Sequence, residues 1–191
     1  MRKRTALFSL TLAMVLLIIT SVMAKDQSST SSQTSSACDS FGFGVVKSQV
    51  ERKAPSFCLK TLDGNEEVVL DGLKGKHILL KFWATWCPSC LEELPMMQKF
   101  SEGRRDQLVI LLAAIDGEKE KKVRRLIQEH KITLPVLLDP KAKTARSYGV
   151  NFVPASFLIS QEGLIVGTVV GERDWVSQKA WSAVKELFNL R

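Results

Sequence analysis

Residues 78–90 read ILLKFWATWCPSC, and this stretch decides the fold. Its first part, Ile78–Ala84, is a nearly continuous apolar run, which is typical of a buried central strand. Cys87 and Cys90 follow, and Pro88 between them suits the first turn of a helix. The residues after Cys90 repeat an apolar side chain at helical spacing, namely Leu91, Leu94, Met97 and Phe100. The stretch therefore predicts a strand, a CxxC pair and a helix in immediate succession.

The position of the two cysteines predicts redox chemistry. A thiol at a helix start faces unpaired N–H groups and the positive end of the helix dipole, and both favour the thiolate. Two intervening residues allow one helical turn to bring the sulfurs together. We therefore expect Cys87 to be the exposed attacking thiolate and Cys90 to be the resolving thiol that releases a mixed disulfide.

A CxxC pair also occurs in haem-attachment sites, zinc sites and structural disulfides. Leu91 directly after Cys90 excludes the haem-attachment pattern CxxCH. A zinc site needs two further ligands, and Cys38 and Cys58 lack a paired spacing. A purely structural Cys87–Cys90 disulfide stays open, although disulfides that stabilise secreted proteins usually close longer loops.

Outward from the cysteines, strands and helices alternate. Strand patterns are bounded by turn signals such as Asp63-Gly64 and Glu162-Gly163. We expect strands at Phe57–Leu59, Glu67–Leu70, Leu108–Ile115, Val136–Leu138, Ala155–Ser160 and Leu164–Val170. Helices are predicted around Val123–His130 and Ala142–Tyr148, and Asp174 is expected to cap a last helix with Val176, Ala180, Val184 and Leu187 on its buried face. This order predicts the α/β class, with helices on both faces of the sheet.

The N-terminus predicts export. Residues 1–24 join a basic start at Arg2–Arg4 to an apolar stretch, and Val22 and Ala24 fit signal-peptidase preferences. A retained membrane anchor is the alternative, and both place the rest of the chain outside the cytoplasm. Residues 25–53 are expected to be a flexible linker and N-terminal extension, and residues 54–191 the folded domain.

The charge balance argues against nucleic acid as a partner. The formal net charge of the chain is +7, and it falls to +4 without the basic residues of the export segment. The remaining excess is scattered rather than gathered in a stripe.

Several of these segments resemble the TlpA-like branch of the thioredoxin superfamily, which includes the ResA and CcmG/DsbE proteins. The resemblance runs from about residue 54 to 188 and is carried by motifs along its whole length. These motifs are Ala54-Pro55-Ser56-Phe57, Thr61–Gly64, Gly75-Lys76, FWATWCPSCLEELP at 82–95, Pro135–Asp139, Tyr148-Gly149-Val150 and Val153–Ile159. It implies a thioredoxin-like fold with a central mixed sheet, helices on both faces and an extra central insert.

The same resemblance implies roles for further residues. Pro154 would be cis and face the CxxC, and the backbone of Val153 would pair with an extended substrate segment. Trp86 and Pro88 are expected to contact or support the substrate with them. Glu93 matches a family position that would assist proton transfer, with an exposed helix carboxylate as the equal alternative.

Three residues depart from the family pattern. Lys81 stands where relatives carry Asp or Asn, and we expect its ammonium group to reach water. The alternative is that its charge lowers the pKa of a thiol. Cys38 and Cys58 have no family counterpart, and we expect them to form a structural disulfide, with a reactive second pair as the alternative.

These observations together predict an extracytoplasmic thiol–disulfide oxidoreductase that needs no cofactor beyond Cys87 and Cys90 and no metal. Its partners would be protein thiols and disulfides. The resemblance suggests a reductant for cytochrome c maturation, with apocytochrome c as a substrate and a membrane electron donor. The rival interpretations are a copper-binding or copper-delivery module using the CxxC sulfurs, and a scaffold with an inert disulfide.

Overall fold

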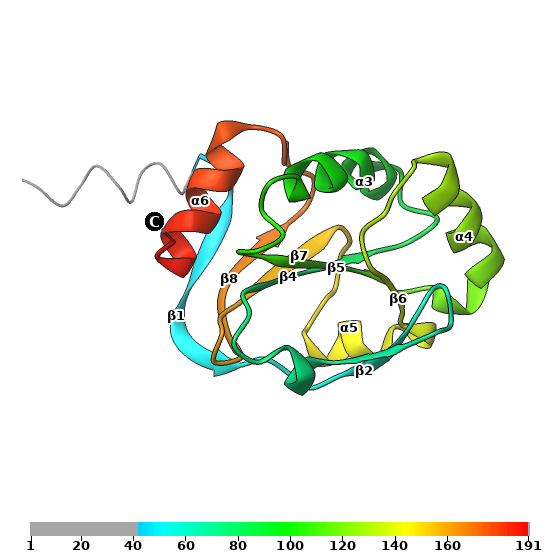
Figure 1. Ribbon diagram of the computed structural model, residues 1–191, viewed down its shortest axis with the longest axis horizontal. Coiled ribbons are helices and arrows are strands. Elements are labelled where there is room, and N and C mark those ends of the chain that lie inside the picture. Colours follow the sequence, from blue (N-terminus) through cyan, green and yellow to red (C-terminus); the bar gives the residue numbers. More distant parts are fainter. Residues whose placement is uncertain (1–41, 191) are drawn as a thin grey trace, which may run out of the picture. The chain divides into compact units, whose positions relative to one another are not determined.

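One mixed sheet organises the domain (Figure 1). The computed structural model describes residues 42–190, and all of them lie in one compact unit. The strand order is β1-β8-β7-β4-β5-β6-β2-β3. The strands are β1 (Val45–Lys53), β2 (Cys58–Thr61), β3 (Glu67–Val69), β4 (Ile78–Trp83), β5 (Val109–Ala114), β6 (Val136–Leu138), β7 (Ala155–Ile159) and β8 (Leu164–Val170).

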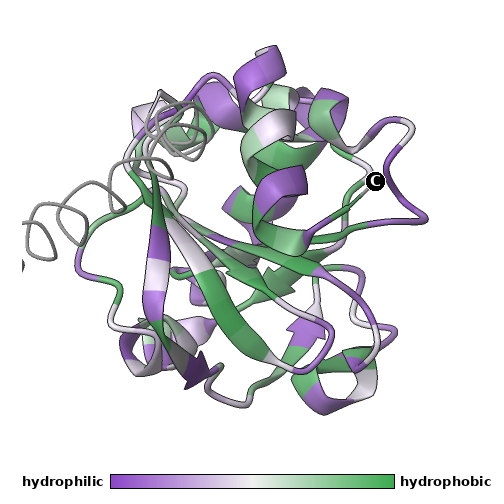
Figure 2. Ribbon diagram, turned by 90° about the vertical axis from the view of Figure 1, so that its left-hand side faces the viewer, coloured by the Kyte–Doolittle hydropathy of each residue, from purple (hydrophilic) through white to green (hydrophobic). Residues whose placement is uncertain are grey.

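The apolar run of the opening motif forms β4, at the centre of the sheet. It pairs in parallel with β5 and antiparallel with β7, and every residue from Ile78 to Trp83 is buried. A strand buried on both faces needs a continuous apolar sequence, so the expected central strand is confirmed. In Figure 2 the central strands are largely green, which marks them as hydrophobic.

Helices cover both faces of the sheet, as expected for the thioredoxin-like fold (Figure 1). The helices are α3 (Pro88–Ser101), α4 (Glu120–Glu129), α5 (Lys143–Ser147) and α6 (Gln178–Phe188). Leu79 and Trp83 of β4 share one apolar cluster with residues of α3, α4 and α6. Leu80 and Phe82 point the other way and share a second cluster with Ala145 of α5. The alternation along β4 thus assigns successive side chains to opposite layers.

The two predicted hairpins form. β2 pairs antiparallel with β3 across Asp63-Gly64, where Gly64 has φ +77°. A residue with positive φ is tolerated best as glycine, which explains the turn. β7 pairs antiparallel with β8 across Glu162-Gly163. The strand expected in the central insert is β6, which lies between β5 and β2.

The sheet begins earlier than the sequence indicated. Val45–Lys53 forms β1, which pairs antiparallel with β8 at the edge of the sheet. Phe43 and Val45 are buried in the main apolar cluster. The boundary expected at Ala54 is therefore wrong for this segment, because β1 (VVKSQVERK) has only three apolar residues and its pairing depends on a strand far along the chain.

The start of the last helix also differs from the prediction. Ser177, not Asp174, is the N-cap of α6, and its side chain accepts a hydrogen bond from the Ala180 N–H. Val176 consequently lies before the helix and is exposed, whereas Ala180 and Val184 are buried as expected.

The expected export segment and most of the linker lie outside the described residues. The same holds for Cys38 and hence for its expected disulfide with Cys58. Within residues 42–190, no helix is long and apolar enough to cross a bilayer.

Candidate active site

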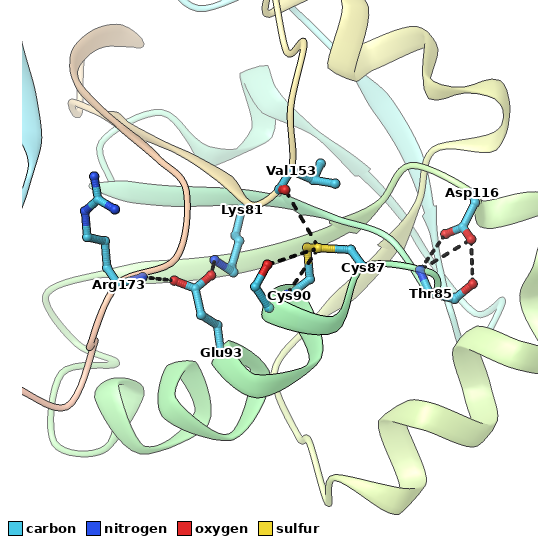
Figure 3. The surroundings of a disulfide bond; sticks show 9 residues. Lys81, Thr85, Cys87, Cys90, Glu93, Asp116, Val153 and Arg173 are labelled. Carbon is cyan, nitrogen blue, oxygen red and sulfur yellow. Dashed lines mark hydrogen bonds and ion pairs between the residues drawn. A yellow bond between two sulfur atoms is a disulfide. The ribbon is translucent and has the colours of Figure 1, made fainter.

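The two cysteines of the motif form a disulfide at the N-terminus of α3 (Figure 3). Cys87 is the N-cap residue, and its Sγ accepts a hydrogen bond from the Cys90 N–H at 3.2 Å. The Cα atoms are 5.3 Å apart, within the ordinary range for a disulfide. The local sequence produces this arrangement because Pro88 begins the helix and the CxxC spacing places both sulfurs on its first turn.

The two sulfurs differ in exposure. Cys87 keeps 4% of its surface exposed and Cys90 none. The order matches the expectation for an attacking and a resolving thiol, but Cys87 is far less exposed than expected. Its sulfur lies 3.5 Å from Ser89 Oγ and 3.7 Å from the Val153 carbonyl oxygen, so neighbouring groups cover it in the disulfide state.

Exposed aromatic side chains lie beside this covered sulfur. Trp86 precedes Cys87 and is 58% exposed, and Phe152 precedes Val153 and is 75% exposed. The Val153–Pro154 peptide bond is cis, as the resemblance implied. Phe152 was not singled out from the sequence, although its place directly before the Val-Pro pair offered a signal.

A polar clamp holds the turn that leads into Cys87. Asp116 follows β5 and accepts hydrogen bonds from Thr85, from its N–H at 3.2 and 3.3 Å and from its Oγ1 at 2.6 Å. Both residues are buried. Sequence reasoning missed Asp116, yet β4 and β5 are parallel, so the residues that follow them meet at one edge of the sheet.

A buried ion pair lies on the other side of the disulfide from this clamp (Figure 3). Lys81 of β4 donates to Glu93 Oε2, and the two side chains are 1% and 0% exposed. The expectation that the ammonium group of Lys81 reaches water is therefore wrong, and so is the alternative of an exposed Glu93. Lys81 shares the β4 face of Leu79 and Trp83, which packs under α3, so its side chain has no path to solvent.

The ionisation of these groups follows from their surroundings. Burial lowers the pKa of Lys81, and the negative charge of Glu93 works against that effect. Partial desolvation and the nearby Glu67 raise the pKa of the Cys58 thiol, which donates to Glu67 Oε2 at 3.5 Å. Among residues 42–190 Cys58 has no disulfide partner, and its exposed thiol is thus held mainly in the protonated, less nucleophilic form.

The donor groups give no support to a metal centre. Across residues 42–190, no three His, Cys, Asp or Glu side chains are grouped as such a site would need. Cys87 and Cys90 are bonded to each other, and no observation favours copper delivery.

Known proteins with similar sequences and structures are thiol–disulfide oxidoreductases. The profile of the AhpC/TSA family matches residues 50–168. The thiol-disulfide oxidoreductase ResA of Bacillus thuringiensis (strain Al Hakam) is 33% identical over 127 residues, which cover 66% of this chain and 73% of that protein.

Two solved structures are also similar to this chain. The crystal structure of StoA from Bacillus subtilis is 30% identical with a TM-score of 0.58, covering 68% of this chain and 97% of that one. The exposed lipoprotein thioredoxin Etrx1 of Streptococcus pneumoniae strain TIGR4 is 33% identical with a TM-score of 0.60. The match covers 69% of this chain and 99% of that one. With the CxxC disulfide at the start of α3, these likenesses show that the chain belongs to the AhpC/TSA family and is a thioredoxin-like thiol–disulfide oxidoreductase of the ResA and StoA type.

Proposed function

We propose that this protein works outside the cytoplasm as a reductant of disulfides in partner proteins, with apocytochrome c among its substrates. The observation that carries the proposal is the Cys87–Cys90 disulfide at the helix N-terminus, with Cys87 4% exposed and Cys90 fully buried. This asymmetry suits a reaction in which one thiol meets the partner and the other finishes the exchange.

The exchange consists of two thiolate attacks. In the reduced protein, the Cys87 thiolate attacks a partner disulfide, so that a Cys87–partner bond forms, the partner's S–S bond breaks, and one partner thiolate leaves and takes a proton. The Cys90 thiolate then attacks Cys87 Sγ, forms the Cys87–Cys90 disulfide and releases the second partner thiolate. The partner gains two electrons and the protein loses two, so no redox group besides the two cysteines is required for this half of the cycle.

The protonation of Cys90 must change during the second step. Glu93 lies three residues after Cys90 on α3, so the two side chains share a face of the helix one turn apart. This placement supports a part for Glu93 in the transfer of the Cys90 proton.

The surface around Cys87 suits a protein partner. Trp86 and Pro88 are exposed next to the cysteine, and Phe152 is exposed next to Val153. The backbone of Val153 offers polar groups to an extended partner segment, and the exposed aromatic side chains next to Cys87 and Val153 offer apolar contacts. Pro154 is buried directly after Val153 and helps to hold that backbone in place.

The N-terminal segment and one relative support the proposed location and the proposed electron donor. Residues 1–24 have the composition of a signal peptide or membrane anchor, and the pneumococcal relative is described as an exposed lipoprotein. A protein outside the cytoplasm must receive electrons through the membrane to remain reduced, so a membrane dithiol protein is the fitting donor.

Peptide disulfides of known chemistry test the proposal. The reduced protein is mixed with an oxidised peptide that contains the haem-attachment pattern CxxCH, and peptide thiols are counted over time. We expect the peptide to be reduced while one Cys87–Cys90 disulfide forms per peptide, and the Cys87→Ser variant to be inactive. Net oxidation of the reduced peptide by the disulfide form, with no reduction in the reverse experiment, would contradict a reductant.

A further inference from the structure

The feature that the exchange chemistry leaves unexplained is a lysine in the middle of the central strand. Lys81 is 1% exposed and lies on the β4 face that packs under α3. The strands on either side place Leu112 and Ser156 at the same register, and neither of these residues ionises. A buried ammonium group is costly unless it has a partner, and here the partner is Glu93.

The carboxylate of Glu93 is held from several directions. Lys81 donates to Oε2, whereas Oε1 accepts from the Arg173 N–H at 2.7 Å and from Trp175 Nε1 at 3.0 Å. Trp175 is itself 1% exposed and packs edge-on against Phe43 and Phe100. These donors fix the position of the carboxylate as well as its charge.

Lys81 alone balances that charge among the groups that the structure describes around Glu93. Arg173 approaches with its backbone N–H, while its guanidinium group bonds to the carbonyl oxygens of Phe43 and Glu172. The remaining ionisable groups on the first turns of α3 are Cys87, Cys90 and Glu92, and Glu92 is exposed on the opposite side of the helix from the buried face.

The pair lies close enough to the cysteines to affect them. Cys90 precedes Glu93 by one helical turn on the same buried face. Cys87 precedes Glu93 by six residues, which is about 9 Å along the axis at the rise per residue of a helix. A single unbalanced charge at such a distance changes the thiolate population severalfold or more at the effective dielectric of a protein.

We propose that Lys81 is a positioning residue that holds Glu93 as a charge-balanced pair behind Cys90, so that no net charge opposes or favours the thiolates. The inference concerns the same cysteines as the proposed function and rests on it for its biological meaning. The cancellation of the two charges can be measured on the thiols themselves, whatever the partner protein is.

Opposite charge changes give opposite expected effects. Lys81→Met leaves an unbalanced carboxylate, which disfavours thiolate, so alkylation of Cys87 slows about tenfold at pH 7. Glu93→Gln leaves an unbalanced ammonium group, so alkylation speeds up by a similar factor at every pH where Lys81 keeps its proton. The double variant Lys81→Met/Glu93→Gln carries neither charge and stays within about threefold of the parent protein.

The experiment measures iodoacetamide alkylation of the reduced full-length protein from pH 5 to 9, with Cys87 and Cys90 followed separately by mass spectrometry. Cys38→Ser/Cys58→Ser serves as the common background, because it removes both cysteines outside the pair. Opposite shifts in the single variants and recovery in the double variant support the proposal. Shifts of the same sign that are largest in the double variant overturn it, because they indicate loosened packing. Superimposable profiles for all three variants also overturn it, because they show that the pair does not influence the thiols.

A second variant covers the case in which a single variant does not fold. Lys81→Arg keeps a positive charge beside Glu93, so that the charge balance of the pair is preserved. A Cys87 alkylation profile within about threefold of the parent protein supports the proposal, and a larger shift overturns it. Failure to reduce any peptide disulfide would refute the proposed function while leaving both of these outcomes unaffected.

Discussion

Removing the carboxylate of Asp116 should loosen the turn that presents Cys87. Asp116 accepts hydrogen bonds from the N–H and the hydroxyl of Thr85, and the two residues are only 5% and 3% exposed. Asp116→Ala leaves both donors buried without this acceptor, and each such group costs about 1–3 kcal/mol. We therefore expect the free energy of unfolding to fall by about 3 kcal/mol, which corresponds to a drop of roughly 6–12 °C in Tm for a domain of this size.

Two variants of Thr85 separate the parts of this clamp. Thr85→Val deletes only the hydroxyl and should cost about 1.5–3 kcal/mol, because a hydrogen bond to a charged group is lost. Thr85→Ser keeps the hydroxyl and should cost less than about 1 kcal/mol. Urea unfolding of the oxidised proteins measures all three, and peptide-disulfide reduction is recorded beside it. An Asp116→Ala protein with unchanged unfolding energy and exchange rate would refute the clamp.

Three further outcomes are expected. Cys90→Ser should accumulate mixed disulfides through Cys87, mapped by mass spectrometry, and adducts on another cysteine would contradict the division of roles. Phe152→Ala should lower kcat/KM for a protein disulfide about fivefold with unchanged stability, because the ring is 75% exposed, and an unchanged kcat/KM would exclude it from partner contact. Tyr148 has a buried hydroxyl with no hydrogen-bond partner in the described chain, and burial raises the pKa of this hydroxyl. As the pH rises, the unfolded state therefore loses this proton before the folded state does, and the free energy of unfolding falls above pH 10. Tyr148→Phe should weaken that alkaline loss in pH-dependent urea unfolding, and an unchanged pH dependence would contradict the assignment.

The sequence predicts the centre of this fold well because its signals there are local. A continuous apolar run, a CxxC pair and a helical repeat all fall within residues 78–100, and they form β4, the disulfide and α3. The Asp63-Gly64 turn likewise depends on neighbours in the chain. Pairing between segments far apart in the chain leaves little local signal, so the sequence of β1 resembles a linker although this strand joins β8 at the sheet edge.

The errors at the site have the same origin. Lys81 and Glu93 belong to different elements, and their contact depends on how α3 packs over β4. The sequence did hold a signal, because Lys81 shares the parity of Leu79 and Trp83, and Glu93 shares the helix face of Cys90. Two opposite charges on facing buried surfaces predict an ion pair more readily than a lysine that reaches water.

Electron exchange at Cys87 and Cys90 is the central claim, and turnover of a protein disulfide by matched cysteine variants tests it most directly. Reduction of insulin disulfides by dithiothreitol is measured with the parent protein and with Cys87→Ser, Cys90→Ser and Cys58→Ser. We predict that the parent and Cys58→Ser accelerate the reaction equally, whereas Cys87→Ser and Cys90→Ser lose the acceleration. Full acceleration by Cys87→Ser, or its loss in Cys58→Ser alone, would contradict the account.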